Sequence, residues 1–219
     1  MILETAKNLG GVGALLLVIA GLAFFANAAF ALLGLVGIIL ILIALKGMAD
    51  KFSDGRIFNN GLYSLIVIIV GVFAFIGALI ASFLFFIGNL PDWVRPFVDA
   101  QDWQGLATAF QNRAMDPASF GSLFTLIGAV LLALIVLFIF AVIGMLLLRR
   151  SLGILSTKTG VGLFGTSGLL LLIGAVLTPI LIGFVLIWIG WILLTAAFFS
   201  VRTVAPSQPA PPTITQPAQ

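Results

Sequence analysis

The residue types that carry much of enzyme chemistry are missing from this chain. Its 219 residues include no histidine and no cysteine. This excludes a Cys/His metal site and any nucleophilic dyad that uses histidine as its base. Four of the seven acidic residues gather in one connection, at Asp92, Asp99, Asp102 and Asp116. They could form a catalytic or cation site, but helix capping and solvation are the commoner roles of such residues. We therefore predict no catalytic residue, no cofactor and no metal.

A second candidate for chemistry is the run Gly165-Thr166-Ser167-Gly168. It is similar to the serine loop of intramembrane rhomboid proteases, whose chemistry also needs a histidine base. Because this chain has no histidine, we interpret the glycines as positions where helices pack closely. We expect the protein not to be an enzyme.

The composition indicates that lipid is the solvent of this chain. Hydrophobic residues make up 62% of the sequence, charged residues 8%, and the mean hydropathy is +1.31. An average soluble domain is about 25% charged. The sequence therefore predicts an all-α integral membrane protein, a bundle of six transmembrane helices, with one membrane domain at residues 1–203. The net charge of +3 does not indicate nucleic acid, because the basic residues flank apolar segments.

Six apolar segments are long enough to be spans. Their expected bounds are about 10–26, 28–49, 61–88, 117–148, 160–177 and 179–199. Asn27 and Thr178-Pro179 divide two runs that are too long for one crossing, so each run becomes a tight hairpin. Whether the first and the fifth helix cross completely stays open. Residues 204–219, rich in Pro, Ser, Thr and Gln, are expected to be a disordered tail.

Residues 89–116 form the one long polar connection between the expected spans. The spacing of Trp103, Leu106 and Phe110 predicts a short amphipathic helix with Asp99 as its N-cap. Elsewhere in the chain, we expect Asn59 or Asn60 to cap the span at 61–88. We expect residues 151–159 to be a short basic connector. Large apolar residues here and on the last helix are candidates for contact with the interface or a partner: Trp93, Phe97, Trp103, Leu106, Phe110, Trp188 and Trp191.

The basic residues predict the orientation. Eight of the ten would lie on one side of a six-span protein: Lys7, Lys46, Lys51, Arg56, Arg149, Arg150, Lys158 and Arg202. Arg95 and Arg113 would lie on the other. Because basic connections remain in the cytoplasm, we predict a multi-pass protein of the cell membrane with both termini cytoplasmic.

Small residues at helical spacing are candidates for close helix packing. They are Gly11, Gly13, Ala74, Gly77, Ala78, Ser82, Gly160 and Gly162. The matching Gly-Val-Gly triplets at 11–13 and 160–162 suggest that the first and last hairpins are parallel repeats, with chance similarity as an even alternative.

No ionisable residue lies well inside an expected span, which argues against a proton-coupled pump. We expect a structural or accessory membrane protein that acts through helix–helix contacts. Its partners would be the lipid bilayer and either further copies of itself or other membrane subunits. The alternative is a small transporter or channel for an uncharged or apolar solute. That alternative requires a water-filled path lined by hydroxyl side chains, with these candidates: Ser64, Ser82, Thr125, Thr166, Ser167 and Thr195.

Two short stretches of the sequence carry a resemblance. The opening Glu4-Thr5-Ala6-Lys7-Asn8-Leu9-Gly10-Gly11-Val12-Gly13 and the connector through Ile57-Phe58-Asn59-Asn60 resemble an archaeal family of multi-pass membrane proteins of unknown function. The resemblance covers roughly residues 1–200 and implies an archaeal source but no activity. Some relatives end in a Pro-rich linker and a Cys-rich zinc ribbon. This chain has a Pro-rich tail and no cysteine, so no ribbon is expected.

Overall fold

The described part of the chain is helical. The computed structural model describes residues 3–23, 27, 30–88, 94–113 and 117–202. Its elements are α1 (Leu3–Ala23), α2 (Ala31–Lys51), α3 (Gly55–Gly88), α4 (Arg95–Asp99), α5 (Trp103–Arg113), α6 (Pro117–Thr159), α7 (Leu163–Leu177), the 3₁₀ turn η2 (Thr178–Ile180) and α8 (Ile182–Phe199). Six of these helices are long and apolar enough to cross a membrane. The predicted all-helical class with six long apolar helices is confirmed, and the expected tail at 204–219 lies outside the described residues.

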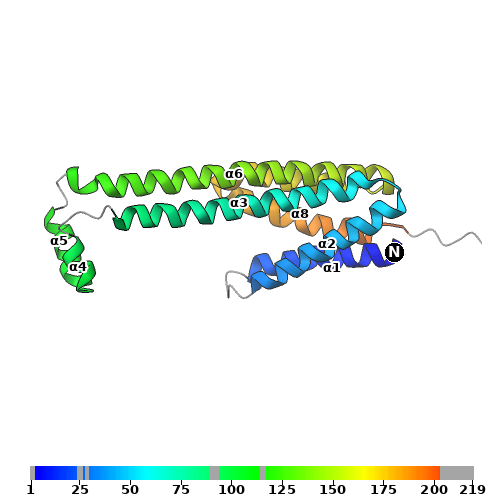
Figure 1. Ribbon diagram of the computed structural model, residues 1–219. Coiled ribbons are helices and arrows are strands. Elements are labelled where there is room, and N and C mark those ends of the chain that lie inside the picture. Colours follow the sequence, from blue (N-terminus) through cyan, green and yellow to red (C-terminus); the bar gives the residue numbers. More distant parts are fainter. Residues whose placement is uncertain (1–2, 24–26, 28–29, 89–93, 114–116, 203–219) are drawn as a thin grey trace, which may run out of the picture.

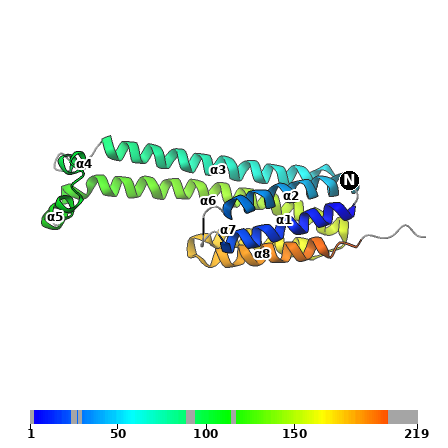
Figure 2. The ribbon, with the colours of Figure 1, turned by 90° about the horizontal axis from the view of Figure 1, so that it is seen from below.

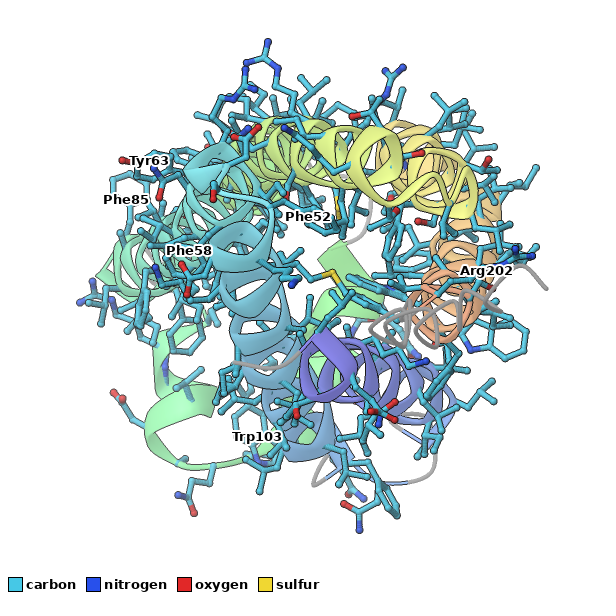
Figure 3. All side chains as sticks on the ribbon, turned by 90° about the vertical axis from the view of Figure 1, so that its right-hand side faces the viewer. Phe52, Phe58, Tyr63, Phe85, Trp103 and Arg202 are labelled. Atoms are coloured by element: carbon cyan, nitrogen blue, oxygen red, sulfur yellow. The ribbon has the colours of Figure 1, made fainter. Side chains whose placement is uncertain are left out.

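The six long helices form a closed ring. α1 packs on α2 and α8, α2 on α3, α3 on α6, α6 on α7, and α7 on α8, as the end-on view shows (Figure 3). The core lies at one end of the ring, where Leu45, Met48 and Leu152 are fully buried. There the rings of Phe164 and Phe198 meet edge to face with centroids 5.1 Å apart.

α3 and α6 extend far beyond the other four helices (Figures 1 and 2). They have 34 and 43 residues, against 21 in α1 and α2, 15 in α7 and 18 in α8. Within the ring, the Gly71 backbone of α3 lies against the Phe140 side chain of α6. We call the parts beyond this contact, residues 72–88 and 117–139, the arm.

Glycines let the helices within each hairpin approach closely. A Cβ on Gly13 would lie 2.7 Å from the Gly37 carbonyl oxygen, so a larger residue would push α1 from α2. Gly174 and Gly183 make the matching approach between α7 and α8. A Cβ on Gly174 would lie 2.9 Å from the Gly183 carbonyl oxygen. The Gly-Val-Gly run at 160–162, by contrast, lies between α6 and α7. The run at 11–13, in contrast, lies inside α1. The two triplets therefore occupy different positions in their hairpins, which does not support the predicted repeat of the first and last hairpins.

Several predicted helix boundaries were wrong. The first helix runs over Leu3–Ala23 and not 10–26, because the turn around the fully buried Ala6 packs on the core. The expected connector 151–159 is the last part of α6, because Ser151, Leu152 and Leu155 are fully buried there and packing outweighs the polar composition. The last helix also begins later than expected, at Ile182, because the residues around Pro179 form a 3₁₀ turn.

Two predicted caps were wrong as well. α3 begins at Gly55, so Asn59 and Asn60 lie inside it, and Asp54 accepts from the Arg56 N–H at 3.2 Å instead. Asp99 ends α4, whereas Asp102 accepts from the Gly105 N–H at 2.9 Å and caps α5. In each case a carboxylate nearer the true helix start takes the role.

Candidate functional site

The charged residues of the described chain lie at two places. One is the end of the ring where α1 begins and α8 ends, which we call the basic end; its basic residues are Lys7, Lys46, Lys51, Arg56, Arg149, Arg150, Lys158 and Arg202. The other is the pair α4 and α5 at the far end of the arm, with Arg95, Asp99 and Asp102. The long helices between these two places carry uncharged residues.

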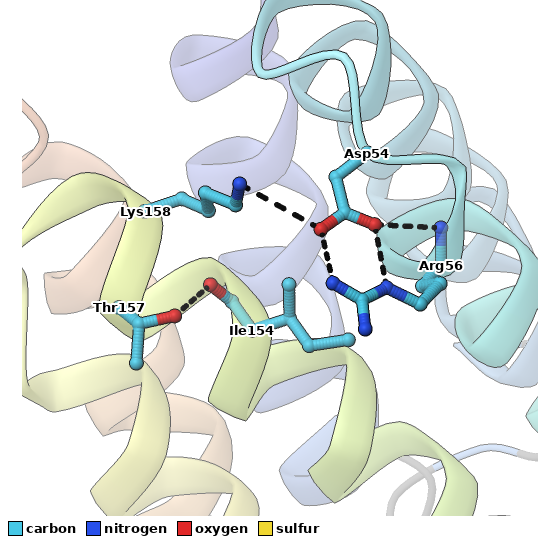
Figure 4. A network of polar contacts seen from close by, with 5 residues as sticks. All are labelled: Asp54, Arg56, Ile154, Thr157 and Lys158. Carbon is cyan, nitrogen blue, oxygen red and sulfur yellow. Dashed lines mark hydrogen bonds and ion pairs between the residues drawn. The ribbon is translucent and has the colours of Figure 1, made fainter.

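A buried carboxylate organises the basic end (Figure 4). Asp54 is 8% exposed and accepts two hydrogen bonds from the Arg56 guanidinium, at 2.9 and 2.8 Å. Lys158 Nζ lies 3.8 Å from its Oδ2. The Arg56 hydrogen bonds lower the pKa of Asp54 to about 2. With this pKa Asp54 stays charged near neutral pH and is unsuited to accept or release a proton there. Its contacts with Arg56 and Lys158 tie the start of α3 to the end of α6.

Three further polar contacts join helices that are distant in the sequence. The Ser151 hydroxyl donates to the Ile57 carbonyl and joins α6 to α3. Lys7 donates to the Val201 carbonyl at 3.4 Å and joins α1 to the segment that follows α8. The third is made by a tryptophan of α8, described next. Sequence reasoning missed these ties, since neither a lone serine nor a lone lysine carries a signal for its partner; the only signal near the Asp54 group was the Asp54-Gly55 turn.

The two tryptophans of α8 lie inside the ring contacts. Trp188 Nε1 donates to the Val18 carbonyl at 3.2 Å and joins α8 to α1. Trp191 is half-buried against the core. Both side chains therefore pack within this chain. The other described residues that were expected to contact the interface or a partner belong to α4 and α5.

α4 and α5 pack on each other beyond the arm (Figures 1 and 2). Phe97 and Leu106 are half-buried, whereas Trp103 is 63% exposed. Trp93 and the side chain of Phe110 lie outside the described residues. Asp99 and Asp102 are exposed, and Asp92 and Asp116 are outside the described residues. Within the described chain no three acidic side chains come together in a group that could hold a metal ion.

Most of the hydroxyls that could line a polar path bond to their own helix. Ser82, Thr125, Thr166, Ser167 and Thr195 each donate to a carbonyl three or four residues earlier, at 2.7 to 3.4 Å. Ser64 is buried in α3. The six residues are spread over α3, α6, α7 and α8, and this arrangement does not assemble a continuous polar lining.

The small residues predicted for packing divide into two groups. Gly11 lies against the Phe199 ring and Gly13 at the α1–α2 crossing. Ala78 and Ser82 lie on the half-buried stripe of α3, while Ala74 and Gly77 are exposed. Nothing lies within 4 Å of a Cβ added to Gly77, Gly160 or Gly162. The structure thus brings about half of these candidates into helix contacts.

Known proteins place the chain in a family. A family described as "Protein of unknown function (DUF996)" matches residues 33–192, which is most of the chain. An uncharacterized protein, MJ1644, of the archaeon Methanocaldococcus jannaschii is 28% identical over 201 residues, covering 92% of this chain and 94% of that protein. No solved structure matches the chain. The predicted resemblance to an archaeal family of unknown function is confirmed, and the chain belongs to the DUF996 family.

Proposed function

We propose that this chain is a structural or accessory integral membrane protein that acts through contacts between helices and catalyses no reaction. Six long apolar helices support insertion of the ring and the arm in the cell membrane. The eight basic residues at one end support an orientation with that end, and both termini, in the cytoplasm. α4 and α5 would then lie on the external side.

The observation that carries the proposal is that the buried polar groups are fully used. Among the described residues, no buried side-chain nitrogen or oxygen lacks a hydrogen-bond partner. Asp54, Ser151 and Trp188 each join two helices of the ring. Catalytic and transport sites are places where polar or ionisable groups are held ready for a ligand. Groups that are already bonded to the protein support a structural role instead.

The external pair α4 and α5 is the proposed contact surface for a partner. Trp103 is 63% exposed, so the bundle itself does not shield it. An aromatic side chain of this size is expected to bury its surface among lipid headgroups or on another protein. Phe97 and Leu106, on the same helix pair, are half-buried. The transport alternative has less support, because its candidate hydroxyls bond within their own helices.

Gentle extraction into lipid nanodiscs, followed by identification of the co-purifying proteins, tests this function. We expect Trp103→Ala to lose a partner that the unmodified protein retains, with insertion unchanged. Gln104→Ala, an exposed neighbour on the same helix, is the control and should keep it. The proposal fails if both variants keep the same partners while the purified protein, reconstituted in vesicles, admits an uncharged solute.

A further inference from the structure

Contacts between helices define a common level near the basic end. A Cβ on Gly61 would lie 2.6 Å from Leu45 Cδ1 and 3.6 Å from Ser151 Oγ. One on Gly168 would lie 3.2 Å from the Cα of Arg149. α2, α3, α6 and α7 therefore pass one level at Leu45, Gly61, Arg149 and Gly168, which we call the basic level. Lys46 and Arg150, beside it in the sequence, carry its charge.

From the basic level the two hairpins are short. α2 rises about 21 Å from Leu45 back to Ala31, at 1.5 Å per residue. α7 rises about 14 Å from Gly168 to Leu177, and η2 adds about 6 Å. The described α2 helix and the α7–η2 segment therefore end about 20 Å from the basic level.

α3 and α6 are about twice as long from the same level. α3 continues for about 41 Å from Gly61 to Gly88, and α6 for about 48 Å from Arg149 to Pro117. The arm therefore projects roughly 20 Å or more beyond the hairpin tips (Figures 1 and 2).

These lengths can be compared with a bilayer. Its hydrocarbon core is about 30 Å thick, and about 40–45 Å with the headgroups. Charged side chains avoid the core, which places Lys46 and Arg149 at its cytoplasmic edge. α3 and α6 then cross the whole core, whereas the hairpins end about 10 Å before its far edge. Tilting the ring shortens every path and leaves the hairpin tips shallower still.

The second hairpin has a tip suited to hydrocarbon. Ile180, Leu181 and Phe184 are 63%, 73% and 57% exposed. The Leu181 N–H donates to the Thr178 carbonyl at 3.0 Å and the Phe184 N–H to the Leu181 carbonyl at 3.2 Å. Pro179 has no N–H to satisfy. Leu181 alone separates η2 from α8, so the turn is short and these backbone hydrogen bonds run through it, which suits a lipid environment.

The described side chains of the arm that α3 and α6 do not shield from each other are almost all apolar, and the exposed Thr125 hydroxyl donates to its own helix. On α3, Phe73 is 70% and Leu84 63% exposed, and on α6 Phe124 is 70% and Leu132 63% exposed. Within the arm, the half-buried residues of α3 form one stripe: Phe75, Ala78, Leu79, Ser82 and Phe86. A partner protein would match one face with a polar rim, whereas lipid chains fit a surface that is apolar all round.

We propose that α1–α2 and α7–α8 are re-entrant hairpins that enter the bilayer from the cytoplasmic face and turn back within its core. Only α3 and α6 cross completely, and acyl chains of the external leaflet fill the space beyond the hairpin tips. This inference rests on the membrane insertion proposed above, and it replaces six complete spans by two. The α2–α3, α3–α6 and α6–α7 connections keep their sides, so the termini stay with the basic end and α5 stays external. Only the two hairpin turns move, from the external side into the core.

The cysteine-free sequence makes a direct test possible. Single cysteines replace Asn27 and Pro179 at the tips, Ser53 at the basic end and Thr108 on α5. A membrane-impermeant maleimide is applied to sealed vesicles of each orientation, and each variant must insert as the unmodified chain does. We expect Ser53→Cys to react in one orientation and Thr108→Cys in the other. In both orientations the tip cysteines should react at least tenfold more slowly than these two. All four cysteines should react fully after denaturation in SDS.

The outcomes separate the two proposals. If Asn27→Cys or Pro179→Cys reacts as fast as Thr108→Cys in the same orientation, that hairpin crosses and the re-entrant arrangement is refuted. If Ser53→Cys and Thr108→Cys react from the same side, the proposed membrane topology itself fails.

A cysteine at Leu84 tests what surrounds the arm. A fluorophore attached to Leu84→Cys should be quenched by lipids brominated on their acyl chains. Oxidation of the unlabelled variant in membranes should give no disulfide-linked dimer. An efficient dimer without quenching would mean that a second copy, and not lipid, covers the arm.

Discussion

Replacing Gly183 by alanine should unfold the second hairpin at a lower temperature. An added Cβ would overlap the Gly174 carbonyl oxygen and the Thr178 amide nitrogen, and would lie 2.5 Å from the Leu177 carbonyl carbon. These are backbone atoms, so no side chain can rotate away, and α7 must move from α8. Overpacking of this kind costs about 1–3 kcal/mol or more. Alanine also has a helix propensity better than glycine by about 1 kcal/mol, which reduces the net loss.

Gly128→Ala is the matched control. Gly128 lies in α6 with nothing within 4 Å of an added Cβ, so only the propensity gain of about 1 kcal/mol applies. Reversible unfolding of the purified variants, followed by circular dichroism in one detergent, should place Gly183→Ala below the unmodified protein and Gly128→Ala at or above it. A Gly183→Ala variant as stable as Gly128→Ala would show that α7 and α8 do not cross at this glycine.

Three other changes have expected outcomes. Ser151→Ala should lower the free energy of unfolding by about 1–3 kcal/mol, because the buried Ile57 carbonyl loses its donor; denaturant titration measures it. Ile180→Lys should make the free energy of membrane insertion less favourable by about 1–3 kcal/mol. Insertion equal to that of the unmodified protein would mean that the tip reaches water. Asp54 has a pKa lowered to about 2, so its contribution to stability is present above its usual value of 3.8 and is lost as the pH falls toward 2. Melting temperatures should fall over that range in the unmodified chain and less in Asp54→Asn, and identical profiles would contradict the Asp54–Arg56 assignment.

The long helices could be predicted because their apolar composition is a local property of the sequence. Their ends could not, because burial decides them. Residues 151–159 are rich in Ser, Thr and Lys, yet Leu155 is buried against the core and keeps α6 helical. Likewise Asp54 precedes α3 and caps it, although Asn59 and Asn60 have equally suitable side chains. Only the contacts of the folded chain select one capping residue among several.

The depth of the hairpins was also beyond sequence reasoning. The lengths of the segments at 61–88 and 117–148 could be counted from the sequence. The extra length of these helices relative to the hairpins can be interpreted only when contacts such as that of Gly168 with Arg149 place all of them at a common level. The polar ties at the basic end were missed for the same reason, since Asp54 and Lys158 lie about half the chain apart and meet only in the fold.

The solitary pair of helices in the arm has a mechanical consequence for the membrane. A helix about 10 Å across occupies roughly 80 Å² of membrane area. With re-entrant hairpins, six helices take up roughly 500 Å² of the cytoplasmic leaflet. Only two helices cross the outer part of the external leaflet, where they take up roughly 160 Å². Such a cone enlarges one monolayer more than the other and gives the bilayer a spontaneous curvature, convex toward the cytoplasm. Crowding many copies into one patch would add their small bends together. The protein would then gather on tubes that are convex toward the cytoplasm and avoid flat membrane.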